Sequence, residues 1–241
     1  MKDWSEIDAW RREQRKQLID LRLALPLSQR RESSAKIEAL IEQAFPFLQD
    51  MTIAFCWPYK AEVDVRFAIH RFRDRGATAA LPEVTGKNRP LQFRKWWPGV
   101  SMRSGPLGIP TPQDTDVVIP QAAIVPLNGF DLRGYRLGYG GGYFDRTLAA
   151  LEHKPLTLGV GFEIGRLSTI YPQAHDIPMD FIVTEAGIHA VEGGKMEHVD
   201  TVSAKEQAHR LLVSRQLVRP EQGTGTDEDN RRGNGSPTSR K

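Results

Sequence analysis

Apolar residues recur along this chain in the two spacings that distinguish helices from strands. A spacing of three to four residues predicts helices at 6–25, 28–45 and 64–76, with Ser5 as the first N-cap and Pro26 as the first stop. The second helix is expected to bury Ala35, Leu40, Ile41, Ala44 and Phe45. Short apolar runs predict strands at 51–55, 77–81, 91–94, 116–119, 122–125, 156–161 and 181–183. This order predicts a single α/β domain with a mostly parallel open sheet flanked by helices.

The C-terminal part of the chain loses this pattern. We assign residues 1–200 to the α/β domain and predict a short helix within 201–220, whose docking the sequence leaves open. Residues 221–241 contain no aliphatic or aromatic side chain, so they cannot bury enough apolar surface to offset the entropy of ordering. We expect a disordered tail there.

Composition narrows the class of protein without choosing a function. The 241 residues are 39% hydrophobic and carry a net charge of +3, spread over scattered arginines. This balance favours small anionic ligands weakly and does not by itself support nucleic-acid binding. The lone Cys56 excludes an intrachain disulfide, and the charged N-terminus resembles neither a secretory signal nor a membrane span. We expect a cytoplasmic monomer without nucleic-acid or membrane partners.

The first predicted helix has a basic edge. At about 100° per residue, Arg11, Arg15 and Arg22 fall on one side, beside the apolar stripe of Ile7, Leu18 and Leu25. Guanidinium groups in this position either form a solvated face or reach over the stripe to a neighbouring site.

The most informative stretch of the chain is the glycine-rich segment 130–146. Glycine adopts positive φ at little cost, so successive glycines can turn several N–H groups inward to hold phosphate oxygens. Residues 143–151 read as a short helix, whose N-terminus favours an anion. Arg136 is suited to bidentate phosphate contact and Asp145 to Mg²⁺ ligation. The segment therefore predicts a phosphate site beside a metal ion, built on Gly138, Gly140, Gly141 and Gly142.

Two common nucleotide motifs do not fit this segment. It lacks the Gly-Lys-Ser/Thr of a Walker A loop, and its glycines do not follow the Gly-x-Gly-x-x-Gly spacing of dinucleotide-binding folds. A glycine-rich hairpin or an Ω-loop with incidental charges remains the alternative explanation.

Residues 126–146 resemble the most specific motif of the 5-formyltetrahydrofolate cyclo-ligase family, also called 5,10-methenyltetrahydrofolate synthetases. Weaker matches occur in the family's order, and the resemblance spans about residues 11 to 187. These matches are Arg22-Leu23-Ala24-Leu25, Glu62-Val63-Asp64, Gly108-Ile109-Pro110-Thr111-Pro112 and Asp176-Ile177-Pro178-Met179-Asp180.

The resemblance implies ATP- and Mg²⁺-dependent conversion of 5-formyltetrahydrofolate to 5,10-methenyltetrahydrofolate, with ADP and phosphate released. It implies catalytic roles for Arg136, Tyr143 and Asp145, and Mg²⁺ ligation by Asp145 and Asp176. For Asp176 the alternative is the start of a turn, which is common for an aspartate before Ile-Pro. The nucleotide contacts that the resemblance implies are Arg11, Arg15, Arg136, Gly138, Tyr139, Gly140, Gly141, Gly142, Tyr143 and Asp145.

A second loop, at residues 56–62, has the composition of a pterin site. Aromatic faces can stack on a flat ring, while a carboxylate accepts two N–H bonds from the ring edge. The alternative is a loop whose aromatics fill the core and whose glutamate is solvated. The folate contacts implied by the resemblance are Trp57, Glu62, Ile109, Pro110 and Tyr143.

Several positions depart from the family's pattern. Arg11 stands where the family has a lysine, Thr111 where it usually has a glutamate, and Asn128 where a small apolar residue is usual. Tyr139 and Gly141 occupy places that are often basic. These departures leave room for a relative that binds nucleotide but has lost or changed the folate activity. A nucleic-acid-binding module using the basic first helix and the tail is a third hypothesis.

Overall fold

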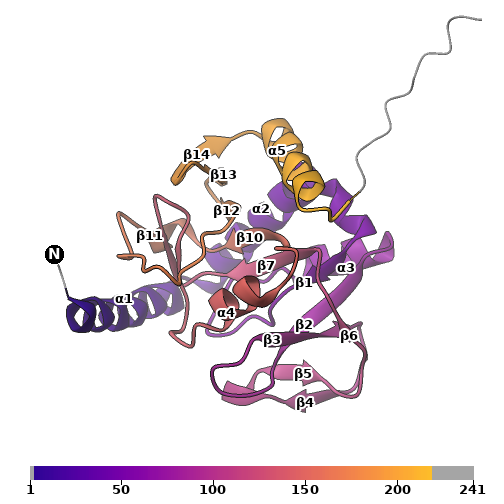
Figure 1. Ribbon diagram of the computed structural model, residues 1–241, viewed down its shortest axis with the longest axis horizontal. Helices are drawn as coiled ribbons and strands as arrows, with labels where there is room; N and C mark the ends of the chain where they lie inside the picture. The colour runs from indigo at the N-terminus through magenta and orange to yellow at the C-terminus, as the bar shows by residue number, and fades with distance from the viewer. Residues whose placement is uncertain (1–2, 219–241) are drawn as a thin grey trace, which may run out of the picture.

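The computed structural model describes residues 3–218, apart from the side chain of Leu107. A nine-stranded sheet forms its centre, in the order β14-β13-β12-β10-β7-β1-β2-β3-β6 (Figure 1). The five inner strands are mutually parallel. They are β2 (Thr78–Val84), β1 (Thr52–Ala54), β7 (Ala122–Pro126), β10 (Leu156–Val160) and β12 (Phe181–Thr184). The prediction of a mostly parallel open sheet is confirmed for this central part.

Antiparallel strands extend both edges of the sheet. On one side they are β3 (Leu91–Trp96) and β6 (Val117–Val118), and on the other β13 (Gly187–Glu192) and β14 (Lys195–Val199). The β13–β14 hairpin was not predicted from the sequence. Its polar outer strand lacks the apolar run that we used to predict strands, because it lies at the sheet edge with one side toward solvent.

Two small sheets complete the strand set. One contains β8 (Gly129–Asp131), β9 (Arg136–Leu137) and β11 (Arg166–Leu167), and the other pairs β4 (Met102–Ser104) with β5 (Pro110–Pro112). Three short 3₁₀ helices occur among the described residues, at Pro46–Asp50, Pro106–Gly108 and Glu163–Gly165.

Helices α2 (Leu27–Ala44), α3 (Arg66–Asp74) and α5 (Thr201–Ser214) share one hydrophobic core with one face of the sheet. Their buried side chains pack against strand residues such as Ile53, Ile124 and Phe181. The opposite face carries the smaller residues Ala54 and Ala123, covered in part by Leu148 of α4 (Tyr143–Ala150). Ile53 and Ala54 thus face different cores, as alternation along a strand requires.

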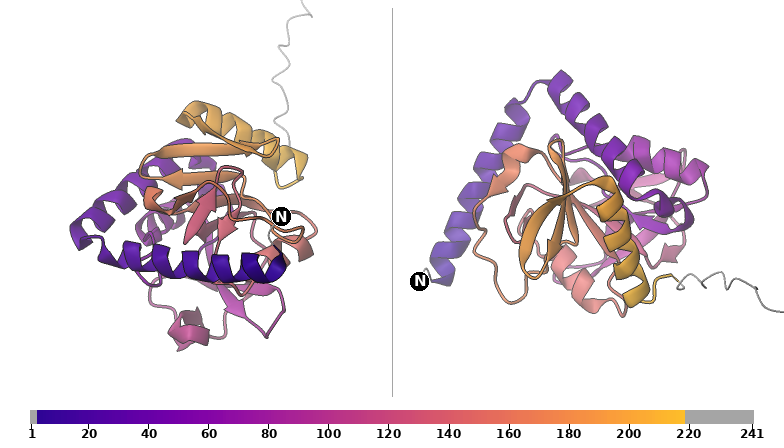
Figure 2. Two further views of the ribbon diagram at one scale, coloured as in Figure 1. Left: turned by 90° about the vertical axis from the view of Figure 1, so that its left-hand side faces the viewer. Right: turned by 90° about the horizontal axis from the view of Figure 1, so that it is seen from above.

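Helix α1 (Trp4–Ala24) packs on the small β8–β9–β11 sheet through a separate cluster of Leu18, Leu137 and Ile170. In the right-hand view of Figure 2 it runs along one side of the molecule and forms a corner with α2. The predicted Ser5 N-cap is wrong. Asp3 is the cap, because Asp3 and Glu6 exchange backbone-to-carboxylate hydrogen bonds of 2.8 and 2.9 Å in a capping box.

The predicted burial of Ile41, Ala44 and Phe45 is confirmed, but the first half of α2 buries other positions than expected. Ala35 is exposed, whereas Ser33, Ser34, Ile37 and Glu38 are buried. Glu38 accepts a 3.0 Å hydrogen bond from the Ala68 backbone N–H in the first turn of α3, which satisfies a helix-terminal donor. A polar side chain can face the core here because α3 supplies its partner.

The C-terminal helix α5 docks on the sheet through Ala204, Ala208 and Leu212. The predicted tail at 221–241 lies outside the described residues. Within residues 3–218 no helix combines the length and the hydropathy needed to cross a bilayer.

Candidate active site

Two loops meet at the carboxyl edge of the parallel strands. One follows β1 and contains Trp57 and Glu62, while the other follows β7 and leads through β8 and β9 to the glycines. Because β1 and β7 are parallel neighbours, their carboxyl ends lie side by side. The Tyr139 hydroxyl donates a 3.0 Å hydrogen bond to Glu62 Oε1, which joins the two predicted sites directly.

The glycine loop ends at the N-terminus of α4. Gly142 is the N-cap, with a φ of 62°, and Gly140 has a φ of 92°. Residues with a Cβ atom rarely adopt this left-handed backbone conformation, so glycine is needed at both positions. A Cβ atom on Gly141 would lie 2.8 Å from the Tyr143 ring. The bare backbone therefore stays accessible beside the unpaired N–H groups of the helix start.

Two arginines flank this backbone. The Arg15 Nε atom donates a 2.9 Å hydrogen bond to the Gly138 carbonyl, and the Arg15 guanidinium lies against Gly140. Burial lowers the pKa of Arg15, and neighbouring Arg11 lowers it further. Arg146, for which the sequence predicted no role, folds back and donates to the Gly141 carbonyl. The loop thus has cations on both sides, a setting that favours an anion.

Arg136 and Asp145 form a largely buried ion pair, with 2.9 Å between Nη2 and Oδ1. Burial lowers the pKa of the Arg136 guanidinium, and the Asp145 carboxylate opposes that shift. The Ile177 N–H donates to Asp145 Oδ1 at 3.0 Å, and Arg136 Nη1 donates to the Ile177 carbonyl at 2.8 Å. Segment 176–178 therefore positions both charged groups.

Arg11 and Asp176, predicted as a phosphate contact and a metal ligand, contact each other. The Arg11 Nη2 atom lies 2.5 Å from Asp176 Oδ2, and Arg11 also donates to the Ile170 and Tyr171 carbonyls. Arg11 is 6% exposed. These contacts attach α1 to segment 170–176. The Arg11 guanidinium therefore has a structural role besides any contact with a ligand.

The carboxylates of Asp145 and Asp176 suit a Mg²⁺ ion only if oxygen atoms of a bound nucleotide complete the coordination shell of the metal. Among residues 3–218 there is no group of three or more Asp, Glu, His or Cys side chains that could hold a metal. Mg²⁺ commonly takes one or two carboxylates and completes its shell with phosphate oxygens and water. The contacts of Asp145 with Arg136 and Ile177 both fall on Oδ1. The Asp145 carboxylate can therefore offer Oδ2 to a Mg²⁺ ion that arrives with a nucleotide.

The β1 loop buries its glutamate. Glu62 is 7% exposed, which contradicts the alternative of a solvated side chain. Its Oε2 atom accepts a 2.9 Å hydrogen bond from the Tyr59 N–H, and burial raises its pKa. Trp57 is half-buried, with the Arg66 guanidinium 4.7 Å from its ring centre.

Arg22 was predicted to lie on the basic edge of the first helix, with no role at a site. It is 3% exposed and reaches the same region, where its Nη2 atom donates a 3.1 Å hydrogen bond to the Tyr139 hydroxyl. Tyr139 was predicted to contact nucleotide, yet its side chain turns toward Glu62 and Arg22. For Arg22 the sequence signals were its helical spacing on α1 and its place in the Arg22-Leu23-Ala24-Leu25 match, neither of which indicates its partners.

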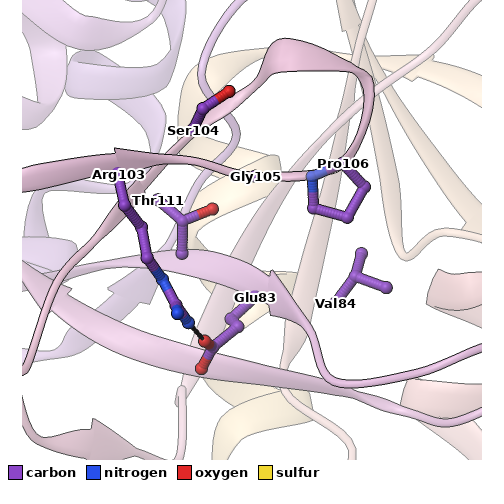
Figure 3. Close-up of a pocket in the computed structure, with 7 residues that line it drawn as sticks. All are labelled: Glu83, Val84, Arg103, Ser104, Gly105, Pro106 and Thr111. Carbon is purple, nitrogen blue, oxygen red and sulfur yellow. Dashed lines mark hydrogen bonds and ion pairs between the residues drawn. The ribbon is translucent and has the colours of Figure 1, made fainter.

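The segment predicted to border the folate site lies at the end of β2. A hollow of about 210 Å³ opens there, and of the segment 108–112 only Thr111 lines it (Figure 3). Figure 3 shows Arg103 reaching across to Glu83. Glu83 also forms an ion pair with Arg94. Ile109 and Pro110 are half-buried in the chain just before Thr111.

Residues 7–185 match the model of the "5-formyltetrahydrofolate cyclo-ligase family". The 5-formyltetrahydrofolate cyclo-ligase of Escherichia coli is 27% identical over 176 residues, covering 69% of this chain and 96% of that protein. The protein of the same name from Haemophilus influenzae is 26% identical over 147 residues, covering 58% and 76%. The solution structure of Aquifex aeolicus 5,10-methenyltetrahydrofolate synthetase superposes with a TM-score of 0.66 at 29% identity, covering 78% of this chain and 96% of that one.

Proposed function

This chain belongs to the 5-formyltetrahydrofolate cyclo-ligase family, and from that membership we propose that it converts 5-formyltetrahydrofolate to 5,10-methenyltetrahydrofolate at the expense of ATP. ADP and inorganic phosphate are the other products. The assignment to the ligases is supported by the names of the relatives and of the structural neighbour.

One observation carries the proposal for this chain. The glycine loop and the buried carboxylate of Glu62 are joined through Tyr139 by a 3.0 Å hydrogen bond. A site for phosphate and a site for a flat heterocycle with N–H groups therefore adjoin each other. This is the arrangement that transfer of a phosphoryl group from ATP to a folate requires.

We assign the triphosphate to the backbone of the glycine loop and to the guanidinium groups of Arg15 and Arg136. Arg15 and Arg136 would contact phosphate oxygens through their planar guanidinium groups. Gly138, Tyr139, Gly140, Gly141 and Gly142 would contribute backbone atoms, and Tyr143 would lie where nucleotide and folate meet. Arg11 would act in the same region while paired with Asp176.

Asp145 would hold the Mg²⁺ that accompanies ATP, with Asp176 as a second candidate. The ion would neutralise charge on the phosphates during transfer. Arg136 keeps the Asp145 carboxylate in place through the 2.9 Å ion pair and contributes a positive charge of its own. Positioning and charge neutralisation, rather than covalent chemistry by side chains, are what we expect from this site.

The proposed reaction activates a poor electrophile. The formyl oxygen attacks the γ-phosphorus, the bond from that phosphorus to the β,γ-bridging oxygen breaks, and ADP leaves. N10 of the folate then attacks the formyl carbon and loses its proton. Cleavage of the carbon–oxygen bond expels phosphate and leaves the methenyl bridge between N5 and N10.

Glu62 would accept hydrogen bonds from the pterin edge, and Trp57 would offer an aromatic surface. Ile109 and Pro110 remain proposed contacts near the hollow beside β2, where Thr111 is the lining residue. We propose that the protein acts in the cytoplasm as a monomer, which size-exclusion chromatography with light scattering would test.

A turnover assay tests the proposed function directly. Folded protein with ATP, Mg²⁺ and 5-formyltetrahydrofolate is expected to generate the near-ultraviolet absorbance of the methenyl product. Omission of ATP is the control and should abolish the signal. If no absorbance develops although calorimetry detects ATP binding without folate binding, the chain is a relative that has lost or changed the folate activity.

Replacement of Arg15 should weaken nucleotide binding selectively. We expect Arg15→Gln to raise the KM for ATP by about 10–100-fold, since a charge-assisted hydrogen bond contributes about 1.5–3 kcal/mol. Initial rates at varied ATP would measure this. The matched control is Arg12→Gln, which alters an exposed arginine on the same helix and should leave the KM unchanged. An unchanged KM in Arg15→Gln would remove Arg15 from the nucleotide site.

A further inference from the structure

Arg22 is a buried cation without a carboxylate partner. Among residues 3–218 no Asp or Glu lies within ion-pair distance of its guanidinium, although the residue is only 3% exposed. Taking a charged group out of water costs several kcal/mol unless other interactions offset that cost. The structure must therefore supply strong acceptors for this side chain.

Those acceptors come from three loop segments that meet at the site. Arg22 Nε donates to the Lys60 carbonyl at 2.9 Å, and Nη1 donates to Asn128 Oδ1 at 3.0 Å and to the Leu127 carbonyl at 3.4 Å. Nη2 donates to the Tyr139 hydroxyl at 3.1 Å. One side chain of α1 thus links the β1 loop, the end of β7 and the glycine loop.

The contact with Tyr139 determines the direction of a hydrogen-bond chain. A phenol has one proton, so a hydroxyl that accepts from Arg22 donates its own proton onward. That proton points to Glu62 Oε1 at 3.0 Å, while Oε2 is held by the Tyr59 N–H at 2.9 Å. These hydrogen bonds run from the Arg22 guanidinium through the Tyr139 hydroxyl to the Glu62 carboxylate, so both oxygens of Glu62 are oriented.

We propose that Arg22 is a positioning residue of the active site, which acts through Tyr139 to orient the Glu62 carboxylate and to offset the cost of burying its negative charge. This inference rests on the proposed function, because Glu62 is the group assigned to the pterin. Asn128, which departs from the family's pattern, takes part by holding the other arm of Arg22.

The electrostatic surroundings of Glu62 agree with this role. Burial raises its pKa, while the Tyr59 N–H, the charge of Arg22 and the Tyr139 hydroxyl lower it. The other titratable groups around it are the Cys56 thiol and the Tyr139 phenol, whose pKa values burial raises, and Lys60 of the same loop. Loss of Arg22 should therefore raise the pKa of Glu62 and favour its neutral form, which accepts hydrogen bonds poorly.

Initial-rate kinetics of Arg22→Gln test the proposal. We expect the KM for 5-formyltetrahydrofolate to rise by about tenfold at pH 7 and the KM for ATP to stay within about twofold. The rise should shrink as pH increases, because Glu62 then ionises without help. Arg22→Lys restores the charge but not the fork of donors, so it should recover the wild-type pH profile with a residual rise in the folate KM.

Tyr139→Phe provides a second test with a smaller structural change, since it removes only the hydroxyl that links Arg22 to Glu62. It should raise the folate KM while leaving the KM for ATP unchanged, and Arg12→Gln should change neither. Equal rises in both KM values, or a folate KM whose rise does not depend on pH in Arg22→Gln, would overturn the positioning role.

Fluorescence titration with 5-formyltetrahydrofolate separates this proposal from the proposed function. A wild-type protein that neither turns over nor binds the folate would overturn both. An active wild-type protein together with Arg22→Gln and Tyr139→Phe variants of unaltered folate affinity would overturn only the role of Arg22. If Arg22→Gln fails to fold, Tyr139→Phe decides the outcome by the same two measurements.

Discussion

Replacing Asp145 with asparagine is expected to lower kcat by about 10²–10³-fold, the usual effect of removing one preorganised electrostatic contact at a reacting centre. Asparagine keeps the size of the side chain and an oxygen that can accept from the Ile177 N–H. It removes the negative charge that Mg²⁺ would require. The proposed chemistry depends on that charge because residues 3–218 offer no cluster of three or more carboxylate, His or Cys ligands.

The same substitution should affect folding much less than turnover. It leaves the Arg136 guanidinium without its counter-charge, although Arg136 keeps its 2.8 Å hydrogen bond to the Ile177 carbonyl. We expect a loss of about 1–3 kcal/mol in the free energy of unfolding, as for a hydrogen bond to a charged group. Denaturant unfolding of both proteins measures this loss.

Steady-state kinetics at varied Mg²⁺ distinguish a metal ligand from a structural partner of Arg136. Asp145→Asn should raise the Mg²⁺ concentration needed for half-maximal rate, whereas Asp145→Glu retains the charge and should keep more activity. Asp20→Asn, an exposed change on α1, serves as the control. Near-normal turnover in Asp145→Asn would show that Asp145 is not the metal ligand.

The largest expected effect on stability is that of Asp180→Asn, about 3 kcal/mol, which is the low end for removing one partner from a buried ion pair. Arg215 binds both oxygens of Asp180, at 2.7 and 2.8 Å, and Lys154 lies 3.1 Å from Oδ1. The Thr157 N–H and hydroxyl also donate to Oδ2. This network attaches the end of α5 to the sheet between β10 and β12.

Without the carboxylate, two cations are left near each other with no counter-charge. Both remain partly exposed, so solvent offsets some of the loss. For a domain of this size the melting temperature should fall by about 6–12 °C. Calorimetry would measure it, with Asp116→Asn as the control, since Asp116 is the exposed half of a surface pair and should change the unfolding free energy by less than about 0.5 kcal/mol.

The contribution of Asp180 to the free energy of unfolding depends on pH in a defined direction. Burial alone would raise the pKa of Asp180, but Arg215 and Lys154 outweigh burial and leave the pKa below its ordinary value. The contribution to stability is therefore complete above the ordinary aspartate pKa of about 4, and it is lost as pH falls through the lower pKa of the folded state. The wild-type and Asp180→Asn proteins should approach equal stability in acid; a difference that persists there would contradict the ionic origin.

Much of the fold follows from neighbouring residues alone. The spacing of apolar residues predicted α1, α2, α3 and the strands of the sheet centre, because periodicity along a chain decides which face an element can bury. The β13–β14 hairpin was not predicted because an edge strand needs apolar residues on one side only and so lacks a continuous apolar run. Ala35 was wrongly predicted to be buried, because the sequence of α2 does not show that Glu38 has a hydrogen-bond partner on α3 and can face the core.

For the candidate site, the sequence indicated which residue types lie together in the glycine segment, but not which distant residues they contact. The sequence by itself determined a backbone free of side chains at Gly140–Gly142, next to a helix start, with Arg136 and Asp145 close by. Only the tertiary structure decided that Arg11 pairs with Asp176, that Tyr139 turns to Glu62, and that Arg22 is buried between the loops. The reason is physical: these contacts join residues 38 to 165 positions apart, so packing of α1 and of two strand ends selects each partner, whereas a glycine's freedom belongs to the residue itself.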